Sequence, residues 1–324
     1  MQERSEMLGR EKISKLLLKL SLPATVGMIV NALYNLVDTI FVGRGVGTLA
    51  IGGLTIAFPI QMIVMAFAQM IGIGAASAVS RRLGAKDVER ADLVTGNAFL
   101  SIIILSAITM TLGLIFVDPL LRLFGATDTL LPYAKDYISI IFLGSIFFSF
   151  AVSSNNLIRA EGNAKMAMFT MIVGTGLNII LDPIFIFTFK LGIRGAALAT
   201  IISQFISFIY ILRYLYSGQS SLNVKFHHFK LKIDIVREIF AVGSAAFARQ
   251  VAGSVVAILV NNSLRIYGGD IAISIYGIVN RLIMFLFMPL FGVIQGMQPI
   301  AGYNYGAKQI GRVKEVVKLS IIAT

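Results

Sequence analysis

Apolar residues fill this chain in long runs that short polar segments separate. Each run exceeds the about 20 residues that a transmembrane helix needs. A ninth run begins a few residues before Thr324, where the sequence stops. The pattern predicts an all-α polytopic membrane protein. The eight complete runs lie at positions 16–42, 50–80, 93–117, 133–158, 166–189, 195–216, 235–266 and 272–301.

The polar segments predict turns at the membrane surfaces. Residues 81–90 are expected to form a polar loop, 118–132 a short polar turn and 159–165 a charged turn. The longest non-apolar segment, 217–232, contains the adjacent residues His227 and His228. A solvated loop is the favoured interpretation there, because adjacent histidines rarely chelate a metal from one face. The N-terminal residues 1–15 predict a cytoplasmic amphipathic lead into the first span.

Charge placement predicts the orientation of the spans. The N-terminus and the loops on its side carry twenty Lys and Arg residues, and the opposite loops carry six. The positive-inside rule therefore places the N-terminus and the 217–232 segment in the cytoplasm of a plasma (inner) membrane. The net charge of +12 sits in these short loops, which argues against nucleic-acid binding. The chain is 57% hydrophobic and contains no Cys, which excludes thiolate metal sites.

An internal repeat appears when the chain is shifted by 222 residues. Positions 47–91 then align with 269–313 without a gap, and the triplet GAK recurs at 84–86 and 306–308. The arginine that follows each triplet, Arg90 or Arg312, is also in register. Apolar composition does not explain these matches. Because six spans, an even number, separate the copies, the repeats are expected to lie parallel in the membrane, as in one common transporter plan.

The repeat predicts a two-lobe helical bundle built from parallel six-helix repeats. Residues 1–216 are expected to form the N-terminal six-helix lobe and 217–233 a cytoplasmic linker. Residues 234–324 would form a C-terminal lobe with the first two helices and the start of the third. The second lobe is thus expected to be truncated, with roughly three and a half helices missing.

The first apolar run carries an unusual polar face. Asp38 lies near its end, and Asn31, Tyr34 and Asn35 precede it at helical spacings. A carboxylate at the centre of a bilayer costs about 2.5–3.5 kcal/mol on insertion scales, so such residues usually face a cavity or a partner. This face is either a cation or proton site or a polar patch that joins helices.

Asp182 is the one other acid buried deep in a span. Asn178 lies four residues before it on the same helical face, and Pro183 frees a nearby backbone carbonyl. From the helical rise, Asp38, Asp182 and Thr200 are expected at similar depths in the outer leaflet. Carboxylate, hydroxyl and carbonyl oxygens suit a hard cation such as Na⁺, and a carboxylate pair can also hold a proton.

Further polar residues within the spans are candidates for a substrate cavity. Arg249 and Arg281 are unusual because they lie inside apolar spans. A guanidinium group there either binds phosphate or carboxylate, or forms a structural ion pair or helix cap. No nucleophile–base pair or metal-ligand spacing is present, so an enzyme is not expected, and no cofactor or metal is predicted beyond the coupling ion. The candidate cavity residues are Asn31, Tyr34, Asn35, Asn155, Gln61, Arg249 and Arg281.

These motifs together resemble the MATE family of multidrug and toxic compound extrusion transporters. The resemblance rests on NALYNLVDTIFVGR (31–44), the two GAK loops, GLNIILDP (176–183) and YGIVNR (276–281). It implies a twelve-helix, monomeric transporter of two six-helix lobes that exports lipophilic, often cationic compounds by Na⁺ or H⁺ antiport. The matching positions imply that Asp38, Asn178, Asp182 and Thr200 couple cation flux to export. The sequence departs from this plan by ending in the ninth helix.

Two other functions stay open at this stage. A flippase for lipid-linked precursors, from the same wider superfamily, would use Arg249 and Arg281 to bind an anionic lipid. A truncated, inactive membrane scaffold is the alternative outside transport. The expected partners are small lipophilic cations and membrane lipid.

Overall fold

The computed structural model describes residues 2–324, with the side-chain surroundings of residues 2–4 and 226 outside the description. Eight helices in this part of the chain are long and apolar enough to cross a membrane, which confirms the all-helical, multi-span prediction. The spans are α2 (Ile13–Gly45), α3 (Thr48–Gly84), α4 (Val88–Ile115), α6 (Leu131–Ala160), α7 (Ala164–Pro183) with η1 (Ile184–Thr188), α8 (Gly192–Tyr216), α9 (Ile233–Tyr267) and α10 (Gly269–Gly306). The short helices are α1 (Gln2–Arg10), α5 (Val117–Leu123), η2 (Phe226–His228) and α11 (Ile310–Ala323).

Several predicted boundaries were wrong at the membrane surfaces. The polar turn expected at 118–132 contains the helix α5. The polar loop expected at 81–90 is reduced to three residues, because α3 continues past its apolar run to Gly84. The next helix begins at once because the Asp87 side chain accepts a hydrogen bond from Arg90 N at 3.2 Å. The helix α3 thus continues beyond the end of its apolar run, because charged residues such as Arg81 and Arg82 also favour a helical backbone.

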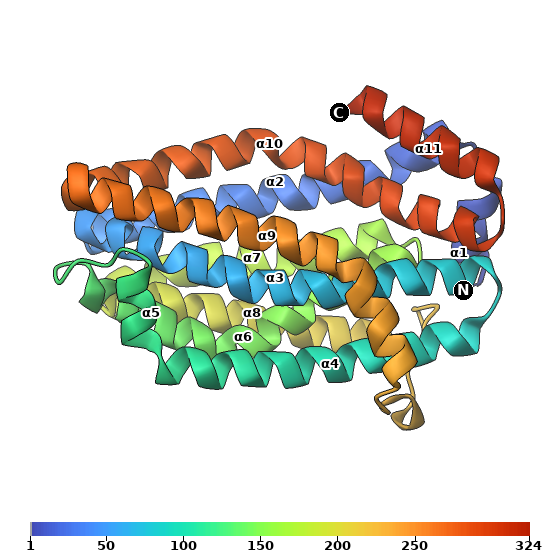
Figure 1. Cartoon of the computed structure of the whole chain (residues 1–324), viewed down its shortest axis with the longest axis horizontal. Helices are drawn as coiled ribbons and strands as arrows, with labels where there is room; N and C mark the ends of the chain where they lie inside the picture. Colours follow the sequence, from blue (N-terminus) through green and yellow to red (C-terminus); the bar gives the residue numbers. More distant parts are fainter. Residues whose placement is uncertain (1) are drawn as a thin grey trace.

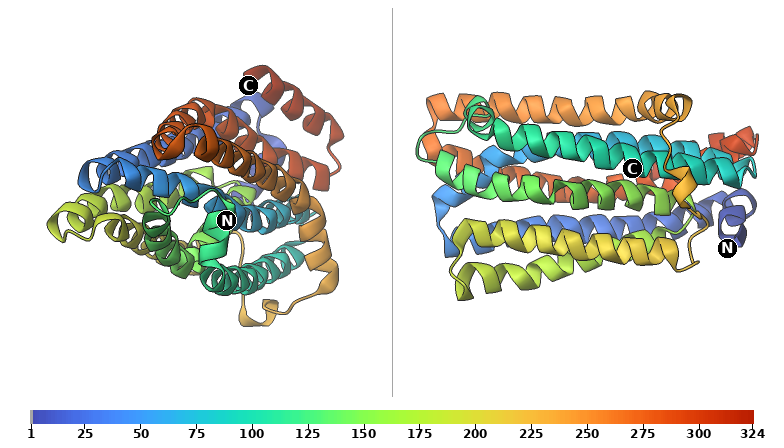
Figure 2. Two further views of the ribbon diagram at one scale, coloured as in Figure 1. Left: turned by 60° about the vertical axis from the view of Figure 1, so that its left-hand side comes forward. Right: turned by 90° about the horizontal axis from the view of Figure 1, so that it is seen from below.

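The spans run side by side along the longest axis of the molecule (Figures 1 and 2). The helix α3 lies at the centre, packed against α4 and α6 of the first lobe and against α9 and α10. The helix α2 lies between α7 and α10. In Figure 1, α1 and α11 lie at one end of the bundle and α5 at the other. The end with α1 and α11 is the one predicted to face the cytoplasm.

The internal repeat is visible in the hydrogen bonds of its turns. After α3, Ala85 N donates to Arg81 O at 3.0 Å and Lys86 N to Leu83 O at 3.1 Å. After α10, the residues 222 positions later make the same two bonds, at 2.9 and 3.1 Å. Lys86 and Lys308 both adopt left-handed backbone conformations, with φ of 62° and 60°. The two GAK segments therefore form equivalent turns.

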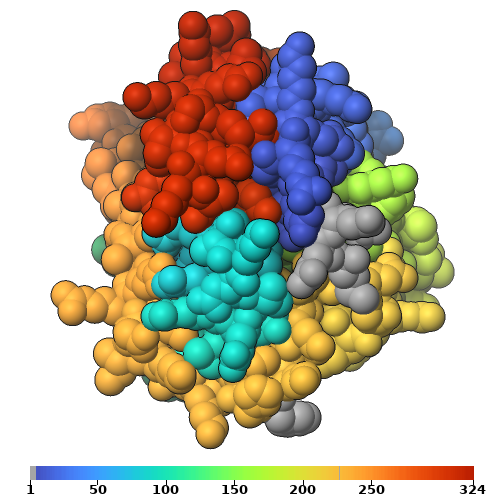
Figure 3. Space-filling view, turned by 90° about the vertical axis from the view of Figure 1, so that its right-hand side faces the viewer, coloured from blue at the N-terminus to red at the C-terminus, as the bar shows by residue number. Residues whose placement is uncertain are grey.

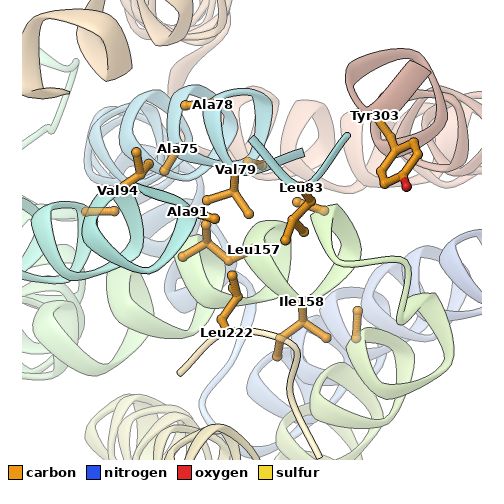
Figure 4. Packing of buried hydrophobic residues seen from close by; sticks show 14 of the residues in the cluster. Ala75, Ala78, Val79, Leu83, Ala91, Val94, Leu157, Ile158, Leu222 and Tyr303 are labelled. Atoms are coloured by element: carbon orange, nitrogen blue, oxygen red, sulfur yellow. The ribbon is translucent and has the colours of Figure 1, made fainter. Parts of the chain in front are cut away.

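Small residues let the helices approach closely near the end of the bundle that contains α1 and α11. Figure 4 shows Ala75 and Val79 of α3 on the side toward Ala91 and Val94 of α4, and Ala78 belongs to the same buried cluster. The same buried cluster includes Leu157 and Ile158 of α6 and Leu222 of the segment 217–232. Leu222 therefore packs this segment against the helices of that cluster.

The expectation of a solvated loop at 217–232 was wrong for four residues, although most of the segment, including His227, is exposed. Ser220, Leu222, Val224 and His228 are all buried. Burial lowers the pKa of His228, with the neighbouring His227 acting in the same direction and Asp92 opposing both. A neutral His228 fits its environment, since its Nδ1 accepts a hydrogen bond from Lys225 N at 3.0 Å.

Acids on the first lobe fix this segment in place. The buried Glu161 accepts hydrogen bonds from Ser220 Oγ at 2.8 Å, from Ser221 N at 2.6 Å and from the Tyr214 hydroxyl. Asp92 Oδ1 accepts from Asn223 N at 2.8 Å. Backbone donors outside helices need such partners once they are buried. These pairings could not be predicted, because the acceptors lie far away along the chain.

Candidate functional site

The polar face predicted on the first span lies along α2 and points into the first lobe at Asp38. The Asp38 side chain is buried, Asn31 and Tyr34 are half-buried, and Asn35 is exposed. The Asn35 amide donates to Asn31 O at 2.7 Å, within its own helix. Because α2 packs against α7, Asp38 is placed opposite the second acid of the lobe.

Asp38 and Asp182 form a pair of carboxyl groups. Each lies within hydrogen-bonding reach of the other, although they are 144 positions apart in the sequence. Asp182 is fully buried and Asp38 retains 5% of its exposure. Among the described residues, Oδ1 of each carboxyl has no hydrogen-bond donor. Two carboxylates this close repel each other strongly unless a proton or a cation lies with them.

Neutral ligands surround Asp182. The Asn178 amide forms hydrogen bonds with two neighbours when it is oriented with its nitrogen toward Asp182. In this orientation the nitrogen donates to Asp182 Oδ2 at 2.8 Å, and the oxygen accepts from Thr200 N at 3.0 Å. Thr200 Oγ1 lies 3.5 Å from the Tyr34 hydroxyl. Directly after Pro183, the helix widens into the π-helical turn Ile184–Thr188. The helices α2, α7 and α8 thus bring the four predicted coupling residues close together.

The sequence reasoning missed Tyr137 of α6. This buried tyrosine interacts with Asp38 and forms a hydrogen bond with Gln61 of α3. A tyrosine in an apolar helix carries no signal of its own, since its partners come from other helices. Gln61, a predicted cavity residue, therefore reaches the acid pair through Tyr137.

Arg281 brings a charge from the second lobe to this cluster. It lies on α10 and interacts electrostatically with Asp38, Tyr137 and Tyr34. Arg281 also lines a small cavity beside Thr55 of α3 and Asn261 of α9. Asn261 is buried, and its Oδ1 has no hydrogen-bond partner among the described residues. The acid pair thus interacts with α10, beside a cavity that α3, α9 and α10 line.

Two predicted cavity residues lie elsewhere. Arg249 is exposed on α9, where its guanidinium lies 6.0 Å from the centre of the Phe291 ring. Asn155 is buried near the C-terminal end of α6, where its amide donates to Ala167 O and Thr170 Oγ1, both at 2.7 Å. Its oxygen accepts from Arg159.

Arg159 is a second residue that the sequence did not single out. It was expected to begin a charged turn, and it instead lies in α6 with only 6% of the residue exposed. Its guanidinium donates to Asn155 Oδ1 and, at 2.9 Å, to Asn156 Oδ1. Asn156 in turn donates to Gln69 Oε1 at 3.1 Å. The sequence does not predict that α3 and α7 bury Arg159, because the residue lies next to the end of its own helix.

The donor set of the acid pair restricts the ions that it suits. No group of three or more His, Cys, Asp and Glu side chains occurs in the described part of the chain. Two carboxyl groups with neutral oxygens fit a proton or a hard monovalent cation better than a transition metal, which prefers nitrogen or sulfur ligands.

The sequence and the fold match one family of known proteins. The MatE family model matches residues 23–184 and 245–324. Multidrug export protein MepA of Staphylococcus haemolyticus (strain JCSC1435) is 32% identical over 311 residues, which cover 96% of this chain and 68% of that protein. MepA of Staphylococcus aureus (strain NCTC 8325 / PS 47) is 30% identical over 314 residues, covering 97% of this chain and 69% of that protein.

Solved structures agree with this match. The MATE multidrug transporter DinF-BH, solved in complex with the dye rhodamine 6G, superimposes with a TM-score of 0.92 at 47% identity. The alignment covers 96% of this chain and 70% of DinF-BH. A MOP superfamily transporter from Pyrococcus furiosus superimposes with a TM-score of 0.90 at 30% identity, over 98% of this chain and 70% of that protein. The chain therefore belongs to the MATE family of multi-span membrane transporters.

Proposed function

We propose that the chain carries the cation-coupling site of a multidrug exporter, which expels lipophilic cations in exchange for Na⁺ or H⁺. The observation that carries this proposal is the buried pair Asp38–Asp182. Each carboxyl has one oxygen without a hydrogen-bond donor among the described residues. Such a pair is costly in a membrane unless it binds a cation or a proton in part of each cycle.

The coupling follows from differential binding. A proton or Na⁺ at the pair neutralises the repulsion between Asp38 and Asp182, whereas a cationic drug near Asp38 would compete for the same charge. A ligand shifts a conformational equilibrium only by its differential affinity for the two states. Because Arg281 approaches Asp38 from the second lobe, the charge on the pair also affects how the lobes attract each other.

The relatives support lipophilic cations as the substrates. DinF-BH was solved with rhodamine 6G, and the MepA proteins are described as multidrug export proteins. Arg281 favours a second candidate, the flippase for lipid-linked precursors, because a guanidinium near the cavity suits an anionic head group. The P. furiosus relative is described with a reverse polarity of its binding pocket, which suggests a different function for that protein.

Transport by the purified protein in lipid vesicles separates these functions. Rhodamine 6G is loaded, and its outward movement is recorded under an imposed Na⁺ gradient or an imposed pH gradient. We expect one of the two gradients to accelerate dye efflux, and Asp38→Asn to abolish the acceleration while Phe185→Leu preserves it. A flippase would instead move a lipid probe and ignore the dye, and a scaffold would move neither.

Cysteine labelling tests the proposed orientation. Because the chain has no Cys, single substitutions report directly. Thr129 and Gln219 are both exposed, at opposite ends of the bundle. With an impermeant thiol reagent outside intact cells, Thr129→Cys should react and Gln219→Cys should not. The reverse pattern would contradict a cytoplasmic N-terminus.

A further inference from the structure

The two GAK turns contact each other across the boundary between the lobes. A Cβ atom placed on Gly84 would lie 2.0 Å from Tyr303 O, and one placed on Gly306 would lie 2.0 Å from Arg81 O. Shifting Arg81 by the repeat length of 222 gives Tyr303, so these are the same contact made twice. Each GAK glycine therefore allows its turn to approach the backbone of the other turn, which a larger residue would prevent.

The arginine of the second motif holds the start of the other lobe. Arg312 Nη2 donates to Glu11 O at 2.6 Å and to Leu8 O at 3.3 Å. Its Nε donates to Asn304 Oδ1 at 2.8 Å, and the Asn304 amide donates to Leu8 O at 2.9 Å. The last carbonyls of a helix lack donors within it, and a cation is favourable at this end. Arg312 thus caps α1, which precedes the first span.

Apolar contacts reinforce this hold. Leu8 is fully buried, in the same cluster as Ile300, Tyr303 and Val316 of α10 and α11. A Cβ atom on Gly9 would lie 2.8 Å from the Tyr303 ring. Figure 3 shows this end of the molecule, where the C-terminal segment lies against the N-terminal segment and both adjoin the α3–α4 turn.

The arginine of the first motif makes the reciprocal contact. Arg90 forms an ion pair at 3.8 Å with Asp234, in the first turn of α9. Arg81 and Arg82 both bind Glu238 of α9, at 2.9 and 3.2 Å. The arginine after each GAK turn thus contacts a segment at the start of the other half of the chain. Arg90 contacts the first turn of α9, and Arg312 contacts the end of α1. Arg90–Asp234 is exposed and therefore the weaker half.

We propose that the two GAK–Arg motifs form an interlobe clasp that closes the cytoplasmic end of the transporter. The clasp consists of Gly84, Arg90, Gly306 and Arg312 with the segments that they contact. Its opening would separate the two turns and release α1 from Arg312. This proposal rests on the proposed function as an exporter, and it assigns to the repeated motif a function that the acid pair does not explain.

Distance measurements between spin labels test the clasp without relying on transport. Labels on Lys86→Cys and Lys308→Cys, both exposed, report the separation of the two turns in the full chain in lipid. Gly306→Ala should raise the ratio of long to short distances about tenfold, because the added methyl group meets backbone and cannot be accommodated by a rotamer change. Gly311→Ala is the matched control, since nothing lies within 4 Å of the added Cβ atom.

Arg312 offers an independent variant. Arg312→Ala should raise the same ratio about tenfold, since it removes charge-assisted hydrogen bonds. Arg312→Lys should give a ratio between those of the unaltered protein and Arg312→Ala, because a single ammonium group cannot reproduce the several donors of the guanidinium. The exposed Lys314 on the same helix is the control, as Lys314→Ala. Unchanged distances in folded Gly306→Ala and Arg312→Ala would overturn the proposal.

Cross-linking covers the case in which these variants fail to fold. Gly9→Cys with Tyr303→Cys, joined by a short bifunctional thiol reagent, should hold α1 on α10, remove the long distances and stop rhodamine 6G efflux. Reductive cleavage of the linker should restore both. Long distances that persist after cross-linking would contradict the clasp, even if dye efflux and the acid pair behave as proposed.

Discussion

Two buried polar clusters in the first lobe differ in how completely their groups are paired. Around Arg159, near the C-terminal end of α6, the guanidinium donates to the amide oxygens of Asn155 and Asn156, and the Asn155 amide donates to Thr170 Oγ1. In the other half of the bundle, Asp38 and Asp182 face each other with one unpaired oxygen each among the described residues. Burial alone is therefore a poor guide to function. A cluster whose polar groups are all hydrogen-bonded stabilises one structure. An acid pair whose oxygens lack donors can instead bind an ion.

The comparison predicts that changes to the acid pair affect transport and leave folding intact. Asp38→Asn and Asp182→Asn should each lower gradient-driven rhodamine 6G efflux at least about 100-fold, since the coupling charge is lost. Thermal stability in detergent should stay the same or rise, because the repulsion between the carboxyl groups is relieved. Wild-type efflux from both variants would refute the coupling mechanism.

The Arg159 cluster should respond in the opposite way. Arg159→Met leaves the oxygens of Asn155 and Asn156 buried without donors, and we expect a loss of about 2–4 kcal/mol in the free energy of unfolding. Thermal denaturation followed by size-exclusion chromatography measures the loss. The exposed Lys165 is the matched cation at the same end, and Lys165→Met should change stability little. If Arg159→Met were stable but inactive, the contrast between the clusters would be wrong.

The sequence reveals some parts of this picture more readily than others. Asp38 and Asp182 stand out because acids are rare in apolar spans, and Asn178 follows from its helical spacing. The GAK turns follow from the repeat. Arg159 and the segment 217–232 were misread because their burial depends on partners far away in the sequence, such as Gln69 for the Arg159 cluster.

The neutral ligands of the acid pair should have intermediate effects. Asn178→Ala removes the amide that donates to Asp182 Oδ2 at 2.8 Å, and we expect efflux to fall about tenfold. Thr200→Ala should cost less, because Thr200 Oγ1 already donates to Ala196 O at 3.0 Å within its own helix. Initial rates of rhodamine 6G efflux at matched protein levels give the order. A larger loss from Thr200→Ala than from Asn178→Ala would place the ion nearer α8 than the geometry indicates.

The smallest loss of efflux is expected at Tyr137. This residue lies beside the acid pair but was not among the predicted coupling residues. Tyr137→Phe keeps the buried ring and removes the hydroxyl that bonds Gln61 and lies near Asp38. One hydrogen bond contributes about 0.5–1.5 kcal/mol, so efflux should fall about threefold to tenfold at most. The loss should be smaller under a steep driving gradient. Tyr137 would change only the affinity of Asp38 for the ion, and a higher ion concentration compensates for a lower affinity. Phe185→Leu, on the helical turn beyond Asp182, changes an aromatic side chain without touching this network and should match the unaltered protein. If Tyr137→Phe were as inactive as Asp38→Asn, the tyrosine would have to bind the ion directly, and the coupling site would extend to α6.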